Sequence, residues 1–138
     1  MKLLSDGKCF VCGRENPQGL QVSFEVNRKA KTIKARYRLS AAYQGYAGII
    51  HGGVLALLLD EAMVKLAWEL GLPAVTGEIT VRFPAPLSTE EEVEIVGRIL
   101  REDRRILLAE AHAEDPDGTV VAEAHGRLFR QSGTPPGV

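Results

Sequence analysis

Two segments near the N-terminus alternate apolar and polar residues with the two-residue period of a β-strand. The first covers residues 20–26, and the second covers residues 31–39, where Ile33, Ala35, Tyr37 and Leu39 share one face. The polar residues 27–30 lie between them. This pattern predicts a β-hairpin with one face turned towards a core.

The next long segment, residues 53–70, is apolar on almost all sides as far as Leu59, which predicts a helix buried on several sides. Gly71 and Pro73 follow it, and this order is typical of a helix end. The loop before the helix covers residues 40–50.

Four further β segments are predicted at residues 74–85, 92–101, 106–114 and 120–129, with a turn at residues 115–118 before the last. Long antiparallel strands need cover on one face, and the single apolar helix can supply it. We therefore expect an α+β fold in which a curved antiparallel sheet of about six strands surrounds one central helix. Residues 1–19 are expected to form an N-terminal loop, residues 20–130 the folded domain, and residues 131–138 a flexible tail.

Composition and charge narrow the possible functions. The 138 residues suit one domain with a real core, and 45% hydrophobic with 25% charged residues is ordinary for a soluble protein. A net charge of −1 gives no reason to expect a nucleic-acid partner. Neither a secretory leader nor an apolar stretch of membrane-spanning length is recognised, so a cytoplasmic protein with no membrane partner is expected.

Cys9 and Cys12 form a Cys-x-x-Cys arrangement in the N-terminal loop. A zinc site normally needs four ligands, so the two cysteines are half of one, and no metal ligand is assigned. Three interpretations stay open: a structural turn, a metal site shared with a histidine or a second subunit, and a reversible disulfide.

Asp60 interrupts the apolar helix, and burying an ionised carboxylate is costly unless it has a partner or a purpose. Asp60 is therefore a candidate general base or nucleophile, the alternative being an aspartate satisfied by backbone or by a strand. The adjacent Glu61 has Lys65 four residues later, the favourable order for a helical salt bridge, and we expect that pair.

His51, Gly52 and Gly53 stand at the expected start of this helix. N–H groups at a helix N-terminus point outward, and the helix dipole favours negative charge there, so this is a candidate oxyanion site. Neither a Gly-x-Ser-x-Gly elbow nor a phosphate-binding glycine-rich loop is present in the sequence. Gly52 and Asp60 are separated by about 12 Å along a helix. If both act on one carbonyl, they come from two helices, as in a two-fold dimer.

The stretch from Gln44 to Gly53, followed by Asp60-Glu61-Ala62, resembles the hotdog-fold acyl-CoA thioesterases, specifically the phenylacetate-degradation type. The start of the chain, Cys9 to Gly13 with Asn16 to Leu20, resembles one subgroup of them. The resemblance implies hydrolysis of an acyl-CoA thioester without a cofactor, by a homodimer or a tetramer built from two dimers.

The resemblance also implies roles for individual residues. Asp60 matches the catalytic carboxylate, Gly52 the oxyanion donor, and His51 a residue that positions the thioester. Gly53 is a substrate-binding candidate. Some relatives contact substrate through a polar side chain shortly before His51; here that stretch is Gly48-Ile49-Ile50, so this role falls to Gln44 or is absent. The candidates for binding the coenzyme A phosphates are three cations, the alternative being solvated strand and turn charges: Arg82, Arg104 and Arg105. Two alternatives on the same fold are a non-catalytic acyl-CoA binding protein and an enoyl-CoA hydratase.

Overall fold

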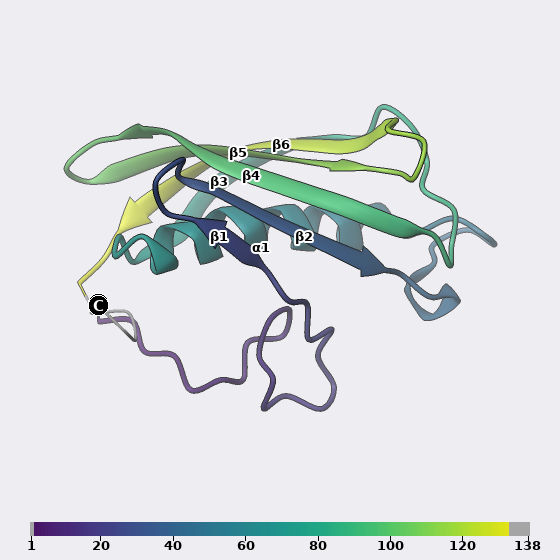
Figure 1. The fold of residues 1–138 in the computed structure, drawn as a ribbon, viewed down its shortest axis with the longest axis horizontal. Coiled ribbons are helices and arrows are strands. Elements are labelled where there is room, and N and C mark those ends of the chain that lie inside the picture. The colour runs from purple at the N-terminus through teal and green to yellow at the C-terminus, as the bar shows by residue number, and fades with distance from the viewer. Residues whose placement is uncertain (1, 133–138) are drawn as a thin grey trace.

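A computed structural model describes residues 2–132, which form six strands, one α-helix and one short 3-10 helix (Figure 1). In chain order the elements are β1 (Glu25–Asn27), β2 (Thr32–Arg38), η1 (Ala41–Tyr43), α1 (Gly52–Glu69), β3 (Ala74–Arg82), β4 (Glu92–Glu102), β5 (Ile106–Glu114) and β6 (Val120–Arg130). The expected order of two strands, one long helix and four strands is confirmed.

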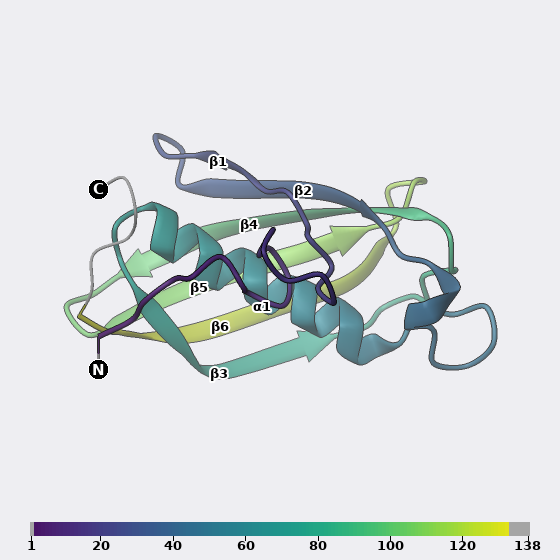
Figure 2. The same ribbon diagram turned by 90° about the horizontal axis from the view of Figure 1, so that it is seen from below.

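The strands form one antiparallel sheet in the order β1-β2-β4-β5-β6-β3. The sheet curves over α1, so the helix lies along its concave face (Figures 1 and 2). In β5, buried and half-buried residues alternate without a break. This alternation turns one face of the strand to the helix, as the sequence pattern predicts. β3 is an edge strand, which leaves one side of its backbone without a neighbouring strand in the described chain.

Helix α1 buries residues on several sides, as its composition predicts; the buried residues are Leu55, Leu58, Leu59, Ala62, Met63, Leu66 and Ala67. Each large apolar side chain buried in this way contributes about 1.5–3 kcal/mol. The helix ends at Glu69, and Gly71 shortly after it has a φ of 77°, which is available to glycine at little cost. The Gly71 and Leu72 N–H groups bond to the Trp68 and Ala67 carbonyls, so the last turn is closed before Pro73.

The N-terminal segment runs across the side of α1 that the sheet leaves open, seen as the purple trace in front of the helix in Figure 2. Its backbone forms hydrogen bonds with residues 20 and 22, which precede β1, and not with a strand. The Leu20 N–H bonds to the Phe10 carbonyl, and the Val22 N–H bonds to the Val11 carbonyl. The helix is therefore covered by the sheet on one side and by this segment on the other.

The prediction for the first strand of the domain is wrong. The strand expected over residues 20–26 is confined to β1, because Gln21 has a φ of 55° and residues 20 and 22 bond to the N-terminal turn. At the other end of the domain, residues 131 and 132 of the expected tail make backbone contacts with the rest of the chain. The Gln131 N–H bonds to the Pro73 carbonyl, and Ser132 pairs with Lys2 in an isolated bridge. The rest of that tail, residues 133–138, lies outside the described residues.

Candidate functional site

The first turn of α1 leaves one backbone donor free. His51 caps the helix: its Nδ1 accepts a hydrogen bond from the Gly53 N–H at 2.9 Å, and its carbonyl accepts one from the Val54 N–H at 3.0 Å. Within residues 2–132 the Gly52 N–H has no hydrogen-bond partner. Gly52 is therefore the donor available to a ligand, and Gly53, expected to bind substrate, uses its N–H to hold the cap.

The cap also selects one tautomer of the neutral His51 ring. Because Nδ1 accepts a hydrogen bond, a neutral His51 carries its proton on Nε2. The side chain is exposed, so this N–H can donate outward. His51 thus orders the helix start and offers a second donor near Gly52.

A cleft of about 450 Å³ opens at this end of the helix. Its lining is Gly45, Tyr46, Ile49, Ile50, His51 and Gly52. The Phe83 ring lies over Gly52, where an added Cβ would be 3.4 Å from two ring carbons. Phe83 and Tyr46 are 50% and 88% exposed, which is unusual for large apolar side chains. The free donor therefore faces a partly apolar surface.

Gln44 is not part of the cleft lining, and its side chain instead holds the loop before His51. Its Oε1 accepts a hydrogen bond from the Gly48 N–H at 3.1 Å, and it pairs with Ile50 in an isolated bridge. The Gln44 side chain thereby closes the turn that precedes His51. Its amide nitrogen remains as a possible substrate donor.

Asp60 is partly buried and has one polar partner on the sheet. The Thr76 hydroxyl, from β3, donates to the Asp60 carboxylate at 2.5 Å. Among residues 2–132 no lysine, arginine or histidine forms a salt bridge with Asp60. The carboxylate is thus oriented by a hydroxyl while its charge stays uncompensated, a state compatible with proton transfer or nucleophilic attack.

A β-bulge adjoins Thr76. The register of β3 against β6 shifts between Thr76 and Glu78, and a Cβ at Gly77 would lie 1.7 Å from the Phe129 ring. Glycine is required there because the ring fills that space. Bulges redirect side chains and are frequent beside active sites, and this one adjoins the residue that contacts Asp60.

The single chain does not bring Gly52 and Asp60 together. They lie on the same helix, separated by about 12 Å along its axis at 1.5 Å per residue. The arginines expected to bind phosphate are separated too. Arg82 ends β3 next to Phe83, near the start of α1, whereas Arg104 and Arg105 lie in the β4–β5 turn at the opposite end of the sheet (Figure 1).

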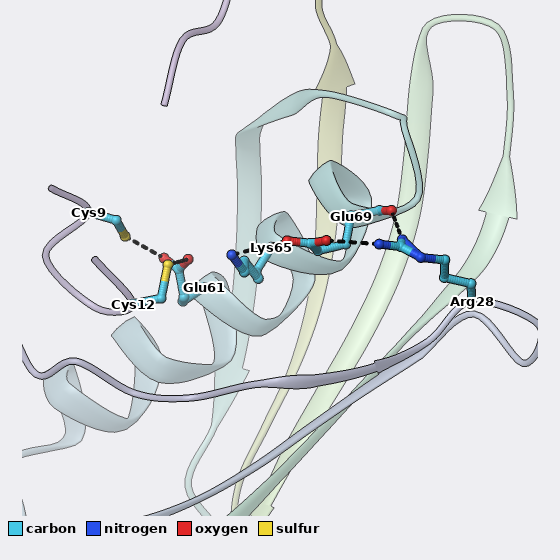
Figure 3. A network of polar contacts seen from close by, with 6 residues as sticks. All are labelled: Cys9, Cys12, Arg28, Glu61, Lys65 and Glu69. Atoms are coloured by element: carbon cyan, nitrogen blue, oxygen red, sulfur yellow. Dashed lines mark hydrogen bonds and ion pairs between the residues drawn. The ribbon is translucent and has the colours of Figure 1, made fainter. Parts of the chain in front are cut away.

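The predicted Glu61–Lys65 salt bridge is wrong. Lys65 pairs with Glu69 at 3.2 Å, and Glu69 also pairs with Arg28 (Figure 3). Glu61 instead accepts hydrogen bonds from the Cys9 and Cys12 thiols, each at 3.3 Å. Lys65 is four residues from both Glu61 and Glu69, and the order of charges favours Glu61. The N-terminal segment reverses this preference because it covers Glu61.

Both cysteines are free thiols in the structure. Burial and, to a smaller extent, the negative charge of Glu61 raise the pKa of Cys12 to about 12. Cys12 is therefore protonated at neutral pH when nothing else binds it.

Two residues and one contact of these sites carry no signal that the sequence alone reveals. Thr76 and Phe83 lie in a β segment of ordinary composition, and each gains its position only because β3 packs along α1. The contact between Glu61 and the cysteines joins residues about 50 positions apart. Only a three-dimensional arrangement could have revealed these contacts.

Comparison with known proteins adds independent information. The thioesterase superfamily matches residues 47–122, more than half of the chain. The chain belongs to the thioesterase superfamily. The matched region contains Gly52, Asp60 and Thr76, and it leaves out the N-terminal segment with its two cysteines. No helix in residues 2–132 of this thioesterase-superfamily chain is long and apolar enough to cross a membrane.

Acyl-coenzyme A thioesterase 13 of the mouse, Mus musculus, is 23% identical over 86 residues. The aligned region spans 61% of this chain and 61% of the mouse protein, less than two thirds of the relative's length.

Solved structures share the fold. A thioesterase superfamily protein aligns with a TM-score of 0.83 and 26% identity, covering 95% of this chain and 68% of that one. Escherichia coli PaaI, from the phenylacetic acid degradation operon, aligns at 0.75 with 19% identity, covering 83% of each chain. The expected hotdog fold is thereby confirmed.

A hypothetical thioesterase from Streptococcus pneumoniae, solved with coenzyme A, aligns at 0.74 with 19% identity, covering 80% of this chain and 87% of that one. Two further structures of the same protein carry alanine substitutions. One replaces an aspartate, and the other replaces a threonine sixteen positions later.

Proposed function

We propose that this protein hydrolyses acyl-CoA thioesters, with the Gly52 N–H as oxyanion donor and Asp60 as general base or nucleophile. The observation that carries the proposal is a pair of groups on α1, which within the described residues 2–132 are an unpartnered N–H at the helix start and a carboxylate with no compensating cation. Membership of the thioesterase superfamily and the similarity to an acyl-coenzyme A thioesterase support this choice of reaction.

The chemistry follows from the charges that develop. Attack on the thioester carbonyl places negative charge on its oxygen, which the Gly52 N–H and the N-terminal end of the helix dipole stabilise. Asp60 either removes a proton from the attacking water, which gives the free acid directly, or attacks the carbonyl itself, which gives an acyl-aspartate anhydride that a water molecule then hydrolyses to the free acid and Asp60. In either route the carbon–sulfur bond breaks, and coenzyme A leaves as its thiol after taking up a proton.

Thr76 is proposed as the residue that positions Asp60. Its hydroxyl holds one carboxylate oxygen, which leaves the other to face substrate or water. The spacing from Asp60 to Thr76 is sixteen residues, the same residue types at the same spacing as the two alanine substitutions made in the S. pneumoniae protein. This agreement supports a functional role for the pair.

A dimer is proposed as the active form, because one chain separates the two groups by about 12 Å. An antiparallel second copy of α1 would bring its Asp60 towards Gly52, and two-fold symmetry would create two equivalent sites. The edge strand β3 offers a surface for this contact, since its outer backbone groups lack a strand partner within residues 2–132.

Arg82 is proposed to bind a phosphate of coenzyme A, since it is exposed beside Phe83 at the cleft end of α1. Arg104 and Arg105 lie at the other end of the chain's own helix, so in this proposal they serve only a site of the partner. Arg82→Ala should raise KM for acyl-CoA while leaving kcat nearly unchanged.

The test is steady-state hydrolysis of a panel of aliphatic and aromatic acyl-CoAs, measured by release of free thiol. Wild type should turn over at least one of them, and Asp60→Asn should lose most of kcat. Asp117→Asn makes the same chemical change in the exposed β5–β6 turn and serves as the matched control. Tight binding without turnover would favour the binding protein, and hydration of an enoyl-CoA would favour the hydratase. Undiminished activity of Asp60→Asn would remove Asp60 from the mechanism.

A further inference from the structure

The turn around Cys9 and Cys12 is built so that both thiols face the same way. The Gly13 N–H bonds to the Cys9 carbonyl at 2.9 Å, which closes the turn directly after Cys12. A Cβ at Gly13 would lie 2.4 Å from the Cys9 nitrogen and 2.5 Å from the Gly7 carbonyl oxygen. Only glycine fits there, so this tight geometry depends on the Cys-x-x-Cys-Gly sequence.

Glu61 meets these thiols from the helix. It is half-buried, and its two carboxylate oxygens each accept one thiol, Oε2 from Cys9 and Oε1 from Cys12 (Figure 3). Lys65, one turn further along, is turned away towards Glu69. Among residues 2–132, Glu61 thus has no cationic partner, and thiols are weak donors for a carboxylate. The negative charge of Glu61 is therefore poorly compensated unless a cation binds beside it.

The geometry points to a metal site: we propose that Cys9, Cys12 and Glu61 bind one divalent transition-metal ion of the zinc type. One ligand atom from each residue lies within 4.8 Å of the other two. A tetrahedral zinc with sulfur at about 2.3 Å and oxygen at about 2.1 Å places them about 3.6 Å apart. Each sulfur lies 3.3 Å from a different Glu61 oxygen, Cys9 from Oε2 and Cys12 from Oε1, and each distance differs from this value by a few tenths of an ångström.

The chemistry of the donors selects the class of ion. Two thiolates and one carboxylate suit zinc and its tetrahedral analogue cobalt, and they suit magnesium and calcium poorly. Binding converts both thiols to thiolates, and their two protons pass to solvent. The three donors leave a fourth position, which a water or a small ligand fills from the adjoining cleft of about 420 Å³, lined in part by Asp6, Val64 and Trp68.

An ion at this place fastens the N-terminal segment to α1 at the residue next to Asp60. The segment contains no strand or helix of its own before β1, and it covers the open side of the helix (Figure 2). We therefore expect metal binding to stabilise the fold. The site is separate from the proposed hydrolytic residues, so it stands or falls independently of the proposed function.

The experiment is a cobalt titration of the reduced, chelator-treated full chain. We expect saturation at one ion per chain, with thiolate-to-metal charge-transfer absorption and the visible bands of tetrahedral cobalt, both lost when Zn²⁺ is added. Removing a residue that only hydrogen-bonds to a metal ligand typically weakens metal affinity about 10–100-fold. Removing a ligand itself, as in Cys12→Ser, should therefore weaken the affinity for cobalt more than about 100-fold. Glu61→Gln should also weaken binding, whereas the control Glu69→Gln, two turns along the same helix, should not.

Three results would overturn the proposal. These are a wild-type titration without saturable thiolate absorption, equal affinity in Cys12→Ser, and rapid formation of a Cys9–Cys12 disulfide in air that added Zn²⁺ does not slow. If a variant fails to fold, the wild-type titration still decides. Zn²⁺ should raise the Tm of the wild type progressively, with the logarithm of its free concentration above the Kd, and an unchanged Tm would count against the site.

Discussion

The substitution Gly52→Pro removes one hydrogen-bond donor and leaves the helix start intact. Gly52 is the first residue of α1, a position where proline is favoured because its missing N–H has no partner inside the helix. The preceding residue, His51, has φ −60° and ψ 129°, the extended conformation that a following proline requires. The fold should therefore tolerate the change, and its Tm should stay equal or rise slightly, since proline restricts the unfolded chain.

The expected loss of activity follows from the hydrogen bonds of the first turn. The Gly53 and Val54 N–H groups are held by His51 at 2.9 and 3.0 Å, so neither can replace the lost donor without breaking the cap. Removing one oxyanion donor typically lowers kcat by about 10²–10³, equivalent to about 2.7–4 kcal/mol of transition-state stabilisation. KM should change little, because the oxyanion exists only in the transition state.

Gly52→Ala is the matched control. It adds the same Cβ, 3.4 Å from the half-exposed Phe83 ring, and keeps the N–H. Its kcat should stay within a few-fold of wild type, measured by thiol release on the preferred acyl-CoA. Near-wild-type kcat in Gly52→Pro would refute the oxyanion assignment. An equal loss in Gly52→Ala would show that crowding against Phe83, and not the lost donor, impairs the enzyme.

Three further predictions concern Asp60, the dimer and Cys12. Thr76→Val should lower kcat about 10–100-fold, which corresponds to the loss of one hydrogen bond to a charged group, and should leave Tm nearly unchanged. Thr80→Val, at an exposed position, is the control, and an equal loss of kcat in this variant would contradict the prediction. Heterodimers of Gly52→Pro and Asp60→Asn chains should regain one intact site of two, and no recovery after verified subunit exchange would exclude a composite site. Because burial and Glu61 raise the pKa of Cys12 to about 12, the metal-free protein should lose stability as the pH rises from about 9 towards 12. Urea unfolding across that pH range should show a smaller loss of unfolding free energy in Cys12→Ser than in the wild type. An equal dependence of unfolding free energy on pH in the two proteins would contradict the raised pKa of Cys12.

The secondary structure was largely predictable because its signals are local. The end of α1 is encoded by Gly71, which takes up a positive φ, and by Pro73, which cannot continue the helix. The alternating segments after it became strands with boundaries within a few residues of those expected. Alternation failed at residues 20–24, where Gln21 adopts a positive φ that no residue pattern there indicates.

The charged contacts were less predictable, since helical spacing specifies possible partners and tertiary packing chooses among them. Lys65 stands four residues from both Glu61 and Glu69. It pairs with Glu69 because the Cys9–Cys12 turn occupies the space above Glu61 and Arg28 joins Glu69 from the β1–β2 turn. The prediction therefore named the right cation, Lys65, and the wrong carboxylate. The partners of Glu61, Cys9 and Cys12, are too distant in the sequence for a rule based on helical spacing to identify them.

Asp60 and Glu61 are consecutive, and the helix turns them about 100° apart, so each meets a different part of the chain. Glu61 faces the N-terminal segment, whereas Asp60 faces Thr76 on β3, the strand at the sheet edge. A second copy joined at that edge would continue the sheet and approach the Asp60 side of the helix in one step. The contact that gives the outer backbone groups of β3 their hydrogen-bond partners would then also bring Gly52 of one chain close to Asp60 of the other. A single chain cannot bring these two residues together. For this reason we expect any substitution that prevents pairing at β3 to abolish hydrolysis together with dimerisation, even though it touches no catalytic residue.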